Sequence, residues 1–165
     1  MKKTKIFFLL FSLFVIQGPV LCQTKADSIE QPKFKHSLGM GAGFTTGYGL
    51  SYRFWPGKLG LQGTFSPYSN QDMSDYSLGV SLLFKLVETE KVNLLLYQGN
   101  HFIIRKHKYD NSDDVNTRHF NNGVGIGIEF IILKRVSFNL MGGYAGYENF
   151  ERIAPTGETG LYFRF

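Results

Sequence analysis

The 165-residue sequence has little cysteine, one tryptophan and no apolar run long enough to cross a membrane as a helix. Its only cysteine is Cys22, so the chain has no second thiol with which to form an internal disulfide. The apolar run at residues 6–16 is far shorter than the roughly 20 residues that a spanning helix needs. The sequence therefore excludes a disulfide framework and predicts no spanning helix.

The apolar run has the surroundings of a secretory signal peptide. Three lysines lie among the first five residues, and Gln17, Gly18 and Pro19 interrupt the apolar sequence after the run. A basic leader, an apolar segment of this length and a helix breaker are typical of a signal peptide. We therefore expect a signal peptide at residues 1–22, a short periplasmic segment at 23–33 and the folded domain at 34–165.

The position of cleavage leaves two alternatives for Cys22. Cleavage before Gln23 would put the small residues Val20 and Cys22 at the −3 and −1 positions, and the mature chain would then have no thiol nucleophile. The other reading makes Cys22 a lipidated lipoprotein cysteine. That motif favours a small residue before the cysteine, whereas Leu21 is large.

Positive charge is also scarcer than the formal total indicates. The net charge is +5, and removal of the three leader lysines would lower it to +2. A weakly basic domain gives little support to nucleic-acid binding, which depends on a concentrated basic surface. We expect no nucleic-acid partner.

Glycine and aromatic residues are abundant instead, with 19 Gly, 16 Phe and 9 Tyr. After a polar stretch, apolar residues alternate with small or polar residues in eight segments, which predicts eight β-strands. Short connections are expected at residues 55–58, 87–91 and 133–135, and longer polar loops at 66–74, 108–117 and 148–156. Two features depart from this scheme. The first hairpin, at 45–47, is short where a long one is expected. Residues 92–106 are apolar on both faces, which a bulge or an extension of the strand beyond the membrane would explain, and their register stays open.

The two faces of these strands indicate where the domain resides. The interior of an eight-stranded barrel is only just wide enough to be filled by side chains. The apolar face carries Phe, Tyr, Leu, Ile and Val on nearly every strand and is too bulky to fit inside, whereas the face rich in Gly, Ser, Asn and Thr would fit. The sequence therefore predicts an all-β fold, an eight-stranded antiparallel up-and-down transmembrane β-barrel with a polar interior.

The last eight residues resemble the C-terminal assembly signal of bacterial outer-membrane β-barrels, with Glu158, Gly160, Phe163 and Phe165 at the matching positions. Together with the strands and the leader, residues 34–165 resemble the small eight-stranded outer-membrane proteins. The resemblance implies secretion to the periplasm, recognition by the barrel assembly machinery and a last strand that closes the barrel on the first. The family includes structural anchors, surface-interaction proteins and a few lipid-modifying enzymes, so the resemblance leaves the activity open.

The polar face carries ionisable residues that we expect to form a polar cluster in the lumen, with Glu158 higher up than the others. A carboxylate flanked by cations in so narrow a space favours a closed polar plug over a gated ion path or a catalytic carboxylate. The expected cluster consists of Arg53, Lys85, Glu129, Glu158 and Arg164.

Motifs for metal binding or acyl transfer are weak. The four histidines, at positions 36, 101, 107 and 119, show no HxxxH spacing, so we expect no metal site and no cofactor. The segment at residues 110–114 spaces its oxygens as a calcium loop does, but Val115 replaces the required glycine. His119 lies in a sequence that resembles the His-x-Ser-Asn motif of lipid A deacylases, but Asn121 occupies the serine position and leaves no nucleophile.

Cations gather around the expected loop at residues 108–117. Arg105, Lys106, Lys108 and Arg118 are placed to meet the phosphates of outer-membrane lipid and lipopolysaccharide, and arginine suits such contacts. Aromatic residues near the strand ends are expected to form girdles at the membrane interfaces: Phe54, Trp55, Tyr68, Tyr76 and Phe84. The sequence thus favours a monomeric, non-enzymatic barrel with a structural or surface-interaction role. A lipid-modifying enzyme and a narrow porin-like channel remain the alternatives.

Overall fold

The computed structural model describes residues 34–69, 73–109 and 112–165. The expected signal peptide and periplasmic segment lie outside the described residues. The strands are β1 (His36–Gly43), β2 (Gly49–Phe54), β3 (Leu59–Ser69), β4 (Met73–Glu88), β5 (Val92–Tyr109), β6 (Ser112–Leu133), β7 (Val136–Tyr147) and β8 (Arg152–Arg164). Among the residues described, no helix is long and apolar enough to cross a membrane.

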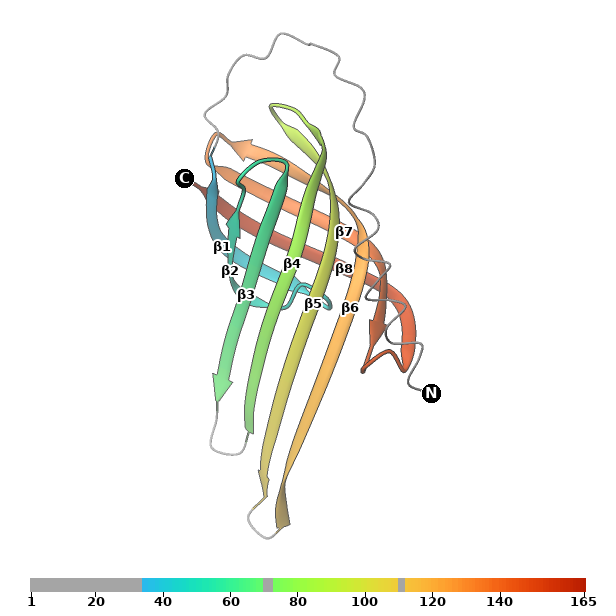
Figure 1. Cartoon of the computed structure of the whole chain (residues 1–165). Helices are drawn as coiled ribbons and strands as arrows, with labels where there is room; N and C mark the ends of the chain where they lie inside the picture. Colours follow the sequence, from blue (N-terminus) through green and yellow to red (C-terminus); the bar gives the residue numbers. More distant parts are fainter. Residues whose placement is uncertain (1–33, 70–72, 110–111) are drawn as a thin grey trace. The chain divides into compact units, whose positions relative to one another are not determined.

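Each strand pairs antiparallel with the next, and β8 pairs with β1, which closes the barrel (Figure 1). The pairing continues to the last residue of the sequence, because His36 N donates to Phe165 O at 3.1 Å and Phe165 N donates to His36 O at 2.9 Å. The predicted eight-stranded up-and-down barrel is confirmed, as is its closure by the last strand on the first.

Alternation along the strands places small and polar side chains inside and apolar side chains outside. On β2, Leu50 is 61% exposed while the next residue, Ser51, is fully buried. The same alternation holds on the other strands, where Val80, Val124 and Leu161 face outward. The exposed apolar surface is far larger than the few hundred Å² that a soluble monomer normally presents.

The register of β5 is now defined. The strand runs without interruption from Val92 to Tyr109, with Leu95 and Tyr97 at 0% and 1% exposure inside the barrel and Leu96 outside. Gly127 and Gly125 face Leu95 and Tyr97 across the β5–β6 pair, so these bulky side chains have room in the lumen. The double-sided apolar pattern therefore reflects an apolar layer inside the barrel. A register shift at Lys85/Val87 on β4 lies opposite Leu95 and Leu94, and two others lie at His107/Tyr109 and Ile131/Leu133.

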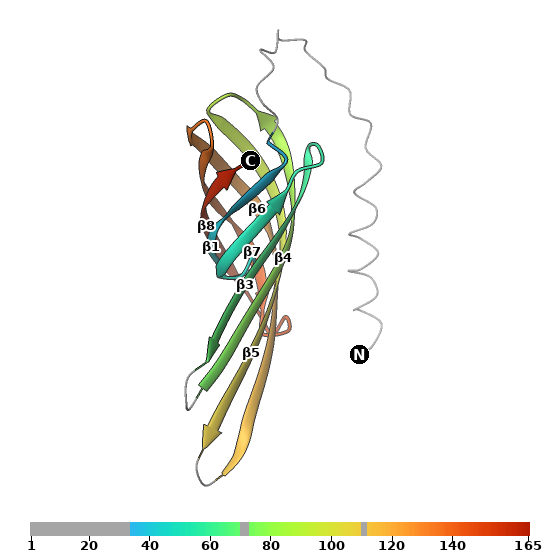
Figure 2. The same cartoon turned by 90° about the vertical axis from the view of Figure 1, so that its left-hand side faces the viewer.

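The long polar loops predicted at one end are wrong in extent, because strand pairing continues through most of them. β3 to β6 reach well past β1 and β2 and form two extended hairpins (Figure 2). β5 and β6 have 18 and 22 residues, against 8 and 6 in β1 and β2. Beyond the barrel both faces of such a ribbon can be polar, so polarity in these segments did not signal a loop.

We call the end with the short β2–β3, β4–β5 and β6–β7 connections and Phe165 the turn end, and the opposite end the hairpin end. Trp55, expected in an aromatic girdle, is instead buried inside the barrel at the turn end with Leu83, Leu95, Tyr97 and Met141. The indole ring lies over Gly60, where a Cβ would fall only 2.5–2.8 Å from the ring atoms, so glycine at this position leaves space for the ring.

Candidate functional site

The connection between β1 and β2 folds into the mouth of the barrel. We call residues 44–48 the inward turn. Thr45 and Thr46, at its centre, are 0% and 2% exposed, although they lie in a connection rather than in a strand. Gly47 and Gly49 adopt φ angles of 81° and 118°, a region that glycine enters without steric cost. This inward course explains why the first hairpin is short at the end where the other hairpins are long.

Three glycines on the opposite wall make room for the inward turn. Gly79, Gly99 and Gly123 lie on the successive strands β4, β5 and β6. A Cβ at Gly79 would overlap the carbonyl oxygen of Thr46, and one at Gly99 would lie 2.7 Å from the carbonyl oxygen of Thr45. The glycines of the lumen are thus a packing surface for this turn.

Glu158 on β8 binds the inward turn with both carboxylate oxygens. Oε1 accepts hydrogen bonds from Thr45 N (3.1 Å), Thr45 Oγ1 (2.6 Å) and Thr156 Oγ1 (2.8 Å). Oε2 accepts from Thr46 N (3.2 Å) and Thr46 Oγ1 (2.7 Å). The carboxylate is 2% exposed and makes no salt bridge within the described part of the chain. Backbone and hydroxyl donors alone therefore satisfy it.

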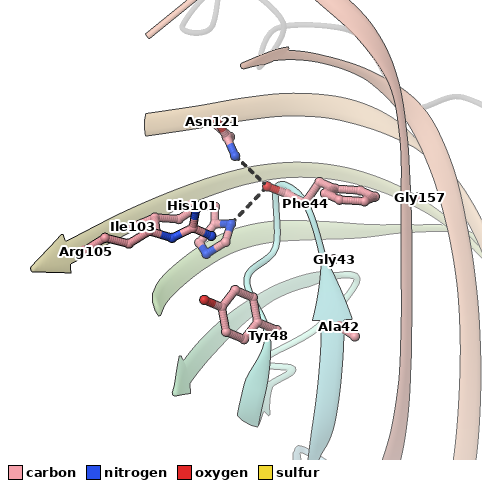
Figure 3. A pocket seen from close by; sticks show the side chains of 9 residues that line it. All are labelled: Ala42, Gly43, Phe44, Tyr48, His101, Ile103, Arg105, Asn121 and Gly157. Atoms are coloured by element: carbon pink, nitrogen blue, oxygen red, sulfur yellow. Dashed lines mark hydrogen bonds between the residues drawn. The ribbon is translucent and has the colours of Figure 1, made fainter. Parts of the chain in front are cut away.

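Two further side chains hold the turn from the other side, at the carbonyl oxygen of Phe44. Asn121 Nδ2 donates to this oxygen at 3.2 Å, and His101 Nδ1 lies 3.0 Å from it (Figure 3). A proton on His101 Nδ1 satisfies that contact, so Nε2 is left to accept from Ser77 Oγ at 2.8 Å. The turn is thereby bonded to β4, β5, β6 and β8.

The Ser77–His101 pair has the composition of a nucleophile and its base. Ser77 is fully buried, and its oxygen also accepts a 3.4 Å hydrogen bond from Tyr48 N. A serine enclosed in this way offers no face to a substrate, so the pair acts as a tether for the inward turn.

A cavity of about 360 Å³ lies above the turn at the hairpin end, lined by His101, Asn121 and Arg105 among others (Figure 3). Asp75 connects two residues of the cavity wall, because its Oδ2 accepts hydrogen bonds from Tyr48 Oη at 3.2 Å and from Arg105 Nε at 3.3 Å. No group of three or more His, Cys, Asp or Glu side chains is placed to hold a metal ion among the residues that the structure describes.

A second buried carboxylate, Glu129, lies nearer the turn end. It accepts from Arg53 Nη1 at 3.3 Å, Asn93 Nδ2 at 2.8 Å and Ser137 Oγ at 2.9 Å. The guanidinium of Arg53 also stacks on the Tyr162 ring, 3.6 Å from its centroid. Arg53 and Glu129 thus form an ion pair inside the barrel.

The five residues expected in the lumen cluster do not all contact one another, and Glu158 was expected higher up than the others. Arg53 and Glu129 are in contact, whereas Glu158 binds the inward turn. Lys85 is buried against Trp55 and forms a 2.6 Å salt bridge with Glu88. Arg164 is half-exposed at the turn end, with its guanidinium 5.3 Å from the Phe34 ring centroid.

The predicted rim residues also separate by face. Arg105 shares the inward-facing side of β5 with His101 and bonds to Asp75, while Lys106 and Arg118 are exposed on the outward side. The side chain of Lys108 lies outside the described residues. In the expected assembly signal, Gly160 is buried, while Phe163 and Phe165 face outward.

The barrel can now be compared with known proteins. No protein-family model matches the sequence, and no curated protein matches it either. The solved N-terminal β-barrel domain of OprF from Pseudomonas aeruginosa superimposes with a TM-score of 0.56 at 12% identity, over 79% of this chain and 95% of that one. Neisserial surface protein A (NspA) gives a TM-score of 0.51 at 14% identity, over 79% and 94% of the two chains. The chain has the fold of the small eight-stranded outer-membrane β-barrels. At these identities the likeness concerns the fold.

The inward turn provides a direct test of this arrangement. Gly79→Ala is expected to lower the free energy of unfolding by about 1–3 kcal/mol, because its Cβ would overlap the Thr46 carbonyl and the backbone would have to shift. Gly63→Ala is the matched control, since a Cβ there would have no atom within 4 Å. Urea unfolding of the barrel in detergent micelles measures both variants, and equal stability of the two would show that the turn does not pack on Gly79.

Proposed function

We propose that the protein is a non-enzymatic component of the bacterial outer membrane. In this proposal it spans the membrane as a monomeric barrel with a closed lumen and presents its two extended hairpins to the exterior. The signal-peptide pattern of the sequence supports secretion to the periplasm. The assembly signal, formed by Glu158, Gly160, Phe163 and Phe165, would be recognised there by the barrel assembly machinery.

Aromatic residues on the outward face support the membrane location. At the turn end, His36 stacks with Tyr52, Phe54 and Phe165, with ring centroids 5.2–6.1 Å apart. At the hairpin end, Tyr76, Phe102 and Phe120 continue the outward face, whereas Tyr68, also expected in a girdle, lies on the inner side of β3 opposite Asp75. Two aromatic girdles that flank an aliphatic band are the usual arrangement in membrane barrels.

The packing of the lumen is the observation that carries the closed-barrel proposal. The inward turn fills the hairpin end, and the layer of Leu83, Leu95, Tyr97 and Met141 and the Arg53–Glu129 pair fill the lumen toward the turn end. Three different kinds of packing thus fill the lumen. An open water path would have to displace all three.

The outward cations support contact with lipid phosphates. Lys106 and Arg118 lie on the same face as Phe102 and Phe120, beyond them toward the hairpin end, so they follow the apolar band where lipid headgroups would begin. Cations at this position can bond to lipopolysaccharide phosphates without leaving water. Arg105 already bonds to Asp75 and is less available for this role.

The experiment compares conductance and folding of the same purified protein. We expect no single-channel conductance in planar bilayers and a compact form that shifts to slower migration on boiling in a detergent gel. A folded protein that shows stable conducting steps would contradict the closed lumen and support the channel alternative. Hydrolysis of membrane phospholipid or lipopolysaccharide by the folded barrel would contradict the non-enzymatic role, with Ser77→Ala testing the buried pair.

A further inference from the structure

Three amide side chains interrupt the apolar outward face of β5 and β6. Gln98 and Asn100 follow Leu96 on the outward side of β5, and Asn122 lies directly opposite Asn100 on β6. All three are half-exposed, and their outward neighbour Val124 is 55% exposed. Polar groups that face lipid are unfavourable unless they are hydrogen-bonded, so their presence in the apolar band indicates a role.

The hydrogen bonds of this amide cluster use up its donors but not its acceptors. Each of the three amide nitrogens donates two bonds, to another amide of the cluster or to the carbonyl oxygens of Val80 and Gly99. Asn100 Oδ1 accepts two of these bonds and Gln98 Oε1 accepts one. Asn122 Oδ1 accepts none from any residue that the structure describes. The cluster therefore offers acceptors to the membrane.

Aromatic residues border the cluster on its hairpin side. The rings of Phe102 and Phe120 lie 4.7 Å apart, and Phe150 lies 6.2 Å from Phe120. Phe150 belongs to the β7–β8 turn, where residues 148–150 have φ angles of 52°, 61° and 71°. Such left-handed conformations cost roughly 1–2 kcal/mol per residue, so this turn is held in place by the structure around it. Asn149 N donates to Phe120 O at 3.0 Å, which fixes the turn beside Asn122.

The order along the outward face is therefore cations, aromatic rings, amides and aliphatic side chains. Arg118 lies four residues from Asn122, about 13 Å along the strand, and its long side chain can bend toward the cluster. A single lipid could place its phosphate at Arg118 and its acyl linkage near the amides. Ester linkages offer only acceptors there, whereas an amide linkage or a hydroxylated acyl chain offers a donor.

We propose that the amide cluster of Gln98, Asn100 and Asn122 is a binding site for a membrane lipid that carries an N–H or O–H donor at its acyl linkage. The proposal rests on the membrane location and deepens the phosphate contact of the proposed function. It assigns to the site a selectivity for amide-linked or hydroxylated lipids over ester-linked glycerophospholipids.

The test measures lipid retention by the purified full chain with native mass spectrometry. Ceramide phosphate and phosphatidic acid of matched chain length share a phosphate monoester and differ at the linkage. We expect about fivefold greater retention of ceramide phosphate, since a hydrogen bond contributes about 1 kcal/mol. The Gln98→Leu/Asn100→Leu/Asn122→Leu variant should retain both lipids equally, and Val124→Leu on the same face should keep the preference.

Two outcomes would overturn the site: equal retention of both lipids by the wild-type protein, or a preference that persists in the triple-leucine variant. Two more probes identify the donor. Retention of a ceramide phosphate without its sphingoid hydroxyl assigns the amide N–H, and retention of phosphatidic acid with a hydroxylated chain assigns the hydroxyl.

A parallel measurement with uncharged ceramide and diacylglycerol separates this site from the phosphate contact. Lys106→Gln/Arg118→Gln should lower retention of the phosphate lipids and leave the ceramide preference unchanged. If that variant retains phosphate lipids as well as the wild type does, the proposed contact of Lys106 and Arg118 with phosphate is wrong. The comparison of the two uncharged lipids still tests the amide site independently.

Discussion

Replacing Glu158 by alanine is expected to free the inward turn and to open the hairpin end of the lumen. The substitution would leave Thr45 N and Thr46 N without their acceptor, inside a part of the barrel where Glu158 itself is 2% exposed. A buried backbone N–H without a partner costs about 1–3 kcal/mol, so the free energy of unfolding should fall by about 2–6 kcal/mol. Urea unfolding in detergent micelles gives this value, and hydrogen exchange at Thr45 N and Thr46 N should be faster than in the wild-type protein.

Glu158→Gln is the control that preserves the shape of the side chain. Its carbonyl oxygen can still accept from one side of the site, but its amide nitrogen would meet a donor on the other side, either at Thr45 or at Thr46. We expect an intermediate loss of stability and faster hydrogen exchange at whichever backbone N–H faces the amide nitrogen. A Glu158→Ala barrel as stable as the wild type, with unchanged hydrogen exchange at Thr45 and Thr46, would show that the turn stays in place without the carboxylate.

The sequence was sufficient to predict the barrel because period-two alternation is a local property of each strand. Segments such as residues 76–84 alternate clearly enough to place Leu78, Val80 and Leu82 outside, and the structure agrees. The closure of the last strand on the first was implied by the resemblance of residues 158–165 to the assembly signal of outer-membrane barrels. Neither inference needed to know which residues meet across the lumen.

The candidate site could not be predicted in the same way, because it depends on contacts between distant strands. In the sequence, residues 45–47 differ from the other connections expected at that end only in being shorter. The register of β1 against β8 brings Thr45 and Thr46 to Glu158, which is more than a hundred residues away in the sequence. The curvature of the barrel wall brings Gly79 against the turn. Glycine on the polar face indicated a small side chain but not its partner.

The contacts within the expected lumen cluster could not be predicted for a related reason. Alternation places Arg53, Glu129 and Glu158 on the inner face, but it does not show which side chains meet in a barrel whose strands differ in length from 6 to 22 residues. The sequence does distinguish the two carboxylates, since a threonine lies two residues before Glu158 and a glycine lies two residues before Glu129. Thr156 supplies one of the bonds to Glu158.

The second large effect is expected at the Arg53–Glu129 pair. Glu129→Leu should lower the free energy of unfolding by about 3–5 kcal/mol, because it leaves the fully buried guanidinium of Arg53 without its carboxylate. Arg53→Met should also destabilise the barrel, although Asn93 and Ser137 continue to bond to Glu129. Both single variants are measured by urea unfolding in micelles.

The double variant Arg53→Met/Glu129→Leu should recover most of this loss. Burying an ion pair costs much of the solvation of both charges, and well-packed apolar groups of similar size often replace such a pair without loss. The hydrogen bonding around this pair is incomplete, since Arg53 Nη2, Asn93 Oδ1 and both amide atoms of Asn139 have no partner among the described residues. Methionine would keep an apolar stem over the Tyr162 ring, where the guanidinium now stacks.

A double-mutant cycle therefore decides what the pair contributes. A double variant within about 1 kcal/mol of the wild type would show that the two charges depend on each other and that the barrel folds without them. If the stability losses of the two single variants simply add in the double variant, the two residues are not coupled. Each would then stabilise the barrel through its other contacts, Arg53 through Gln62 and Glu129 through Asn93. Recordings of the coupled double variant would then show whether the inward turn and the apolar layer close the lumen alone, since in that variant no ion pair remains at this level of the barrel.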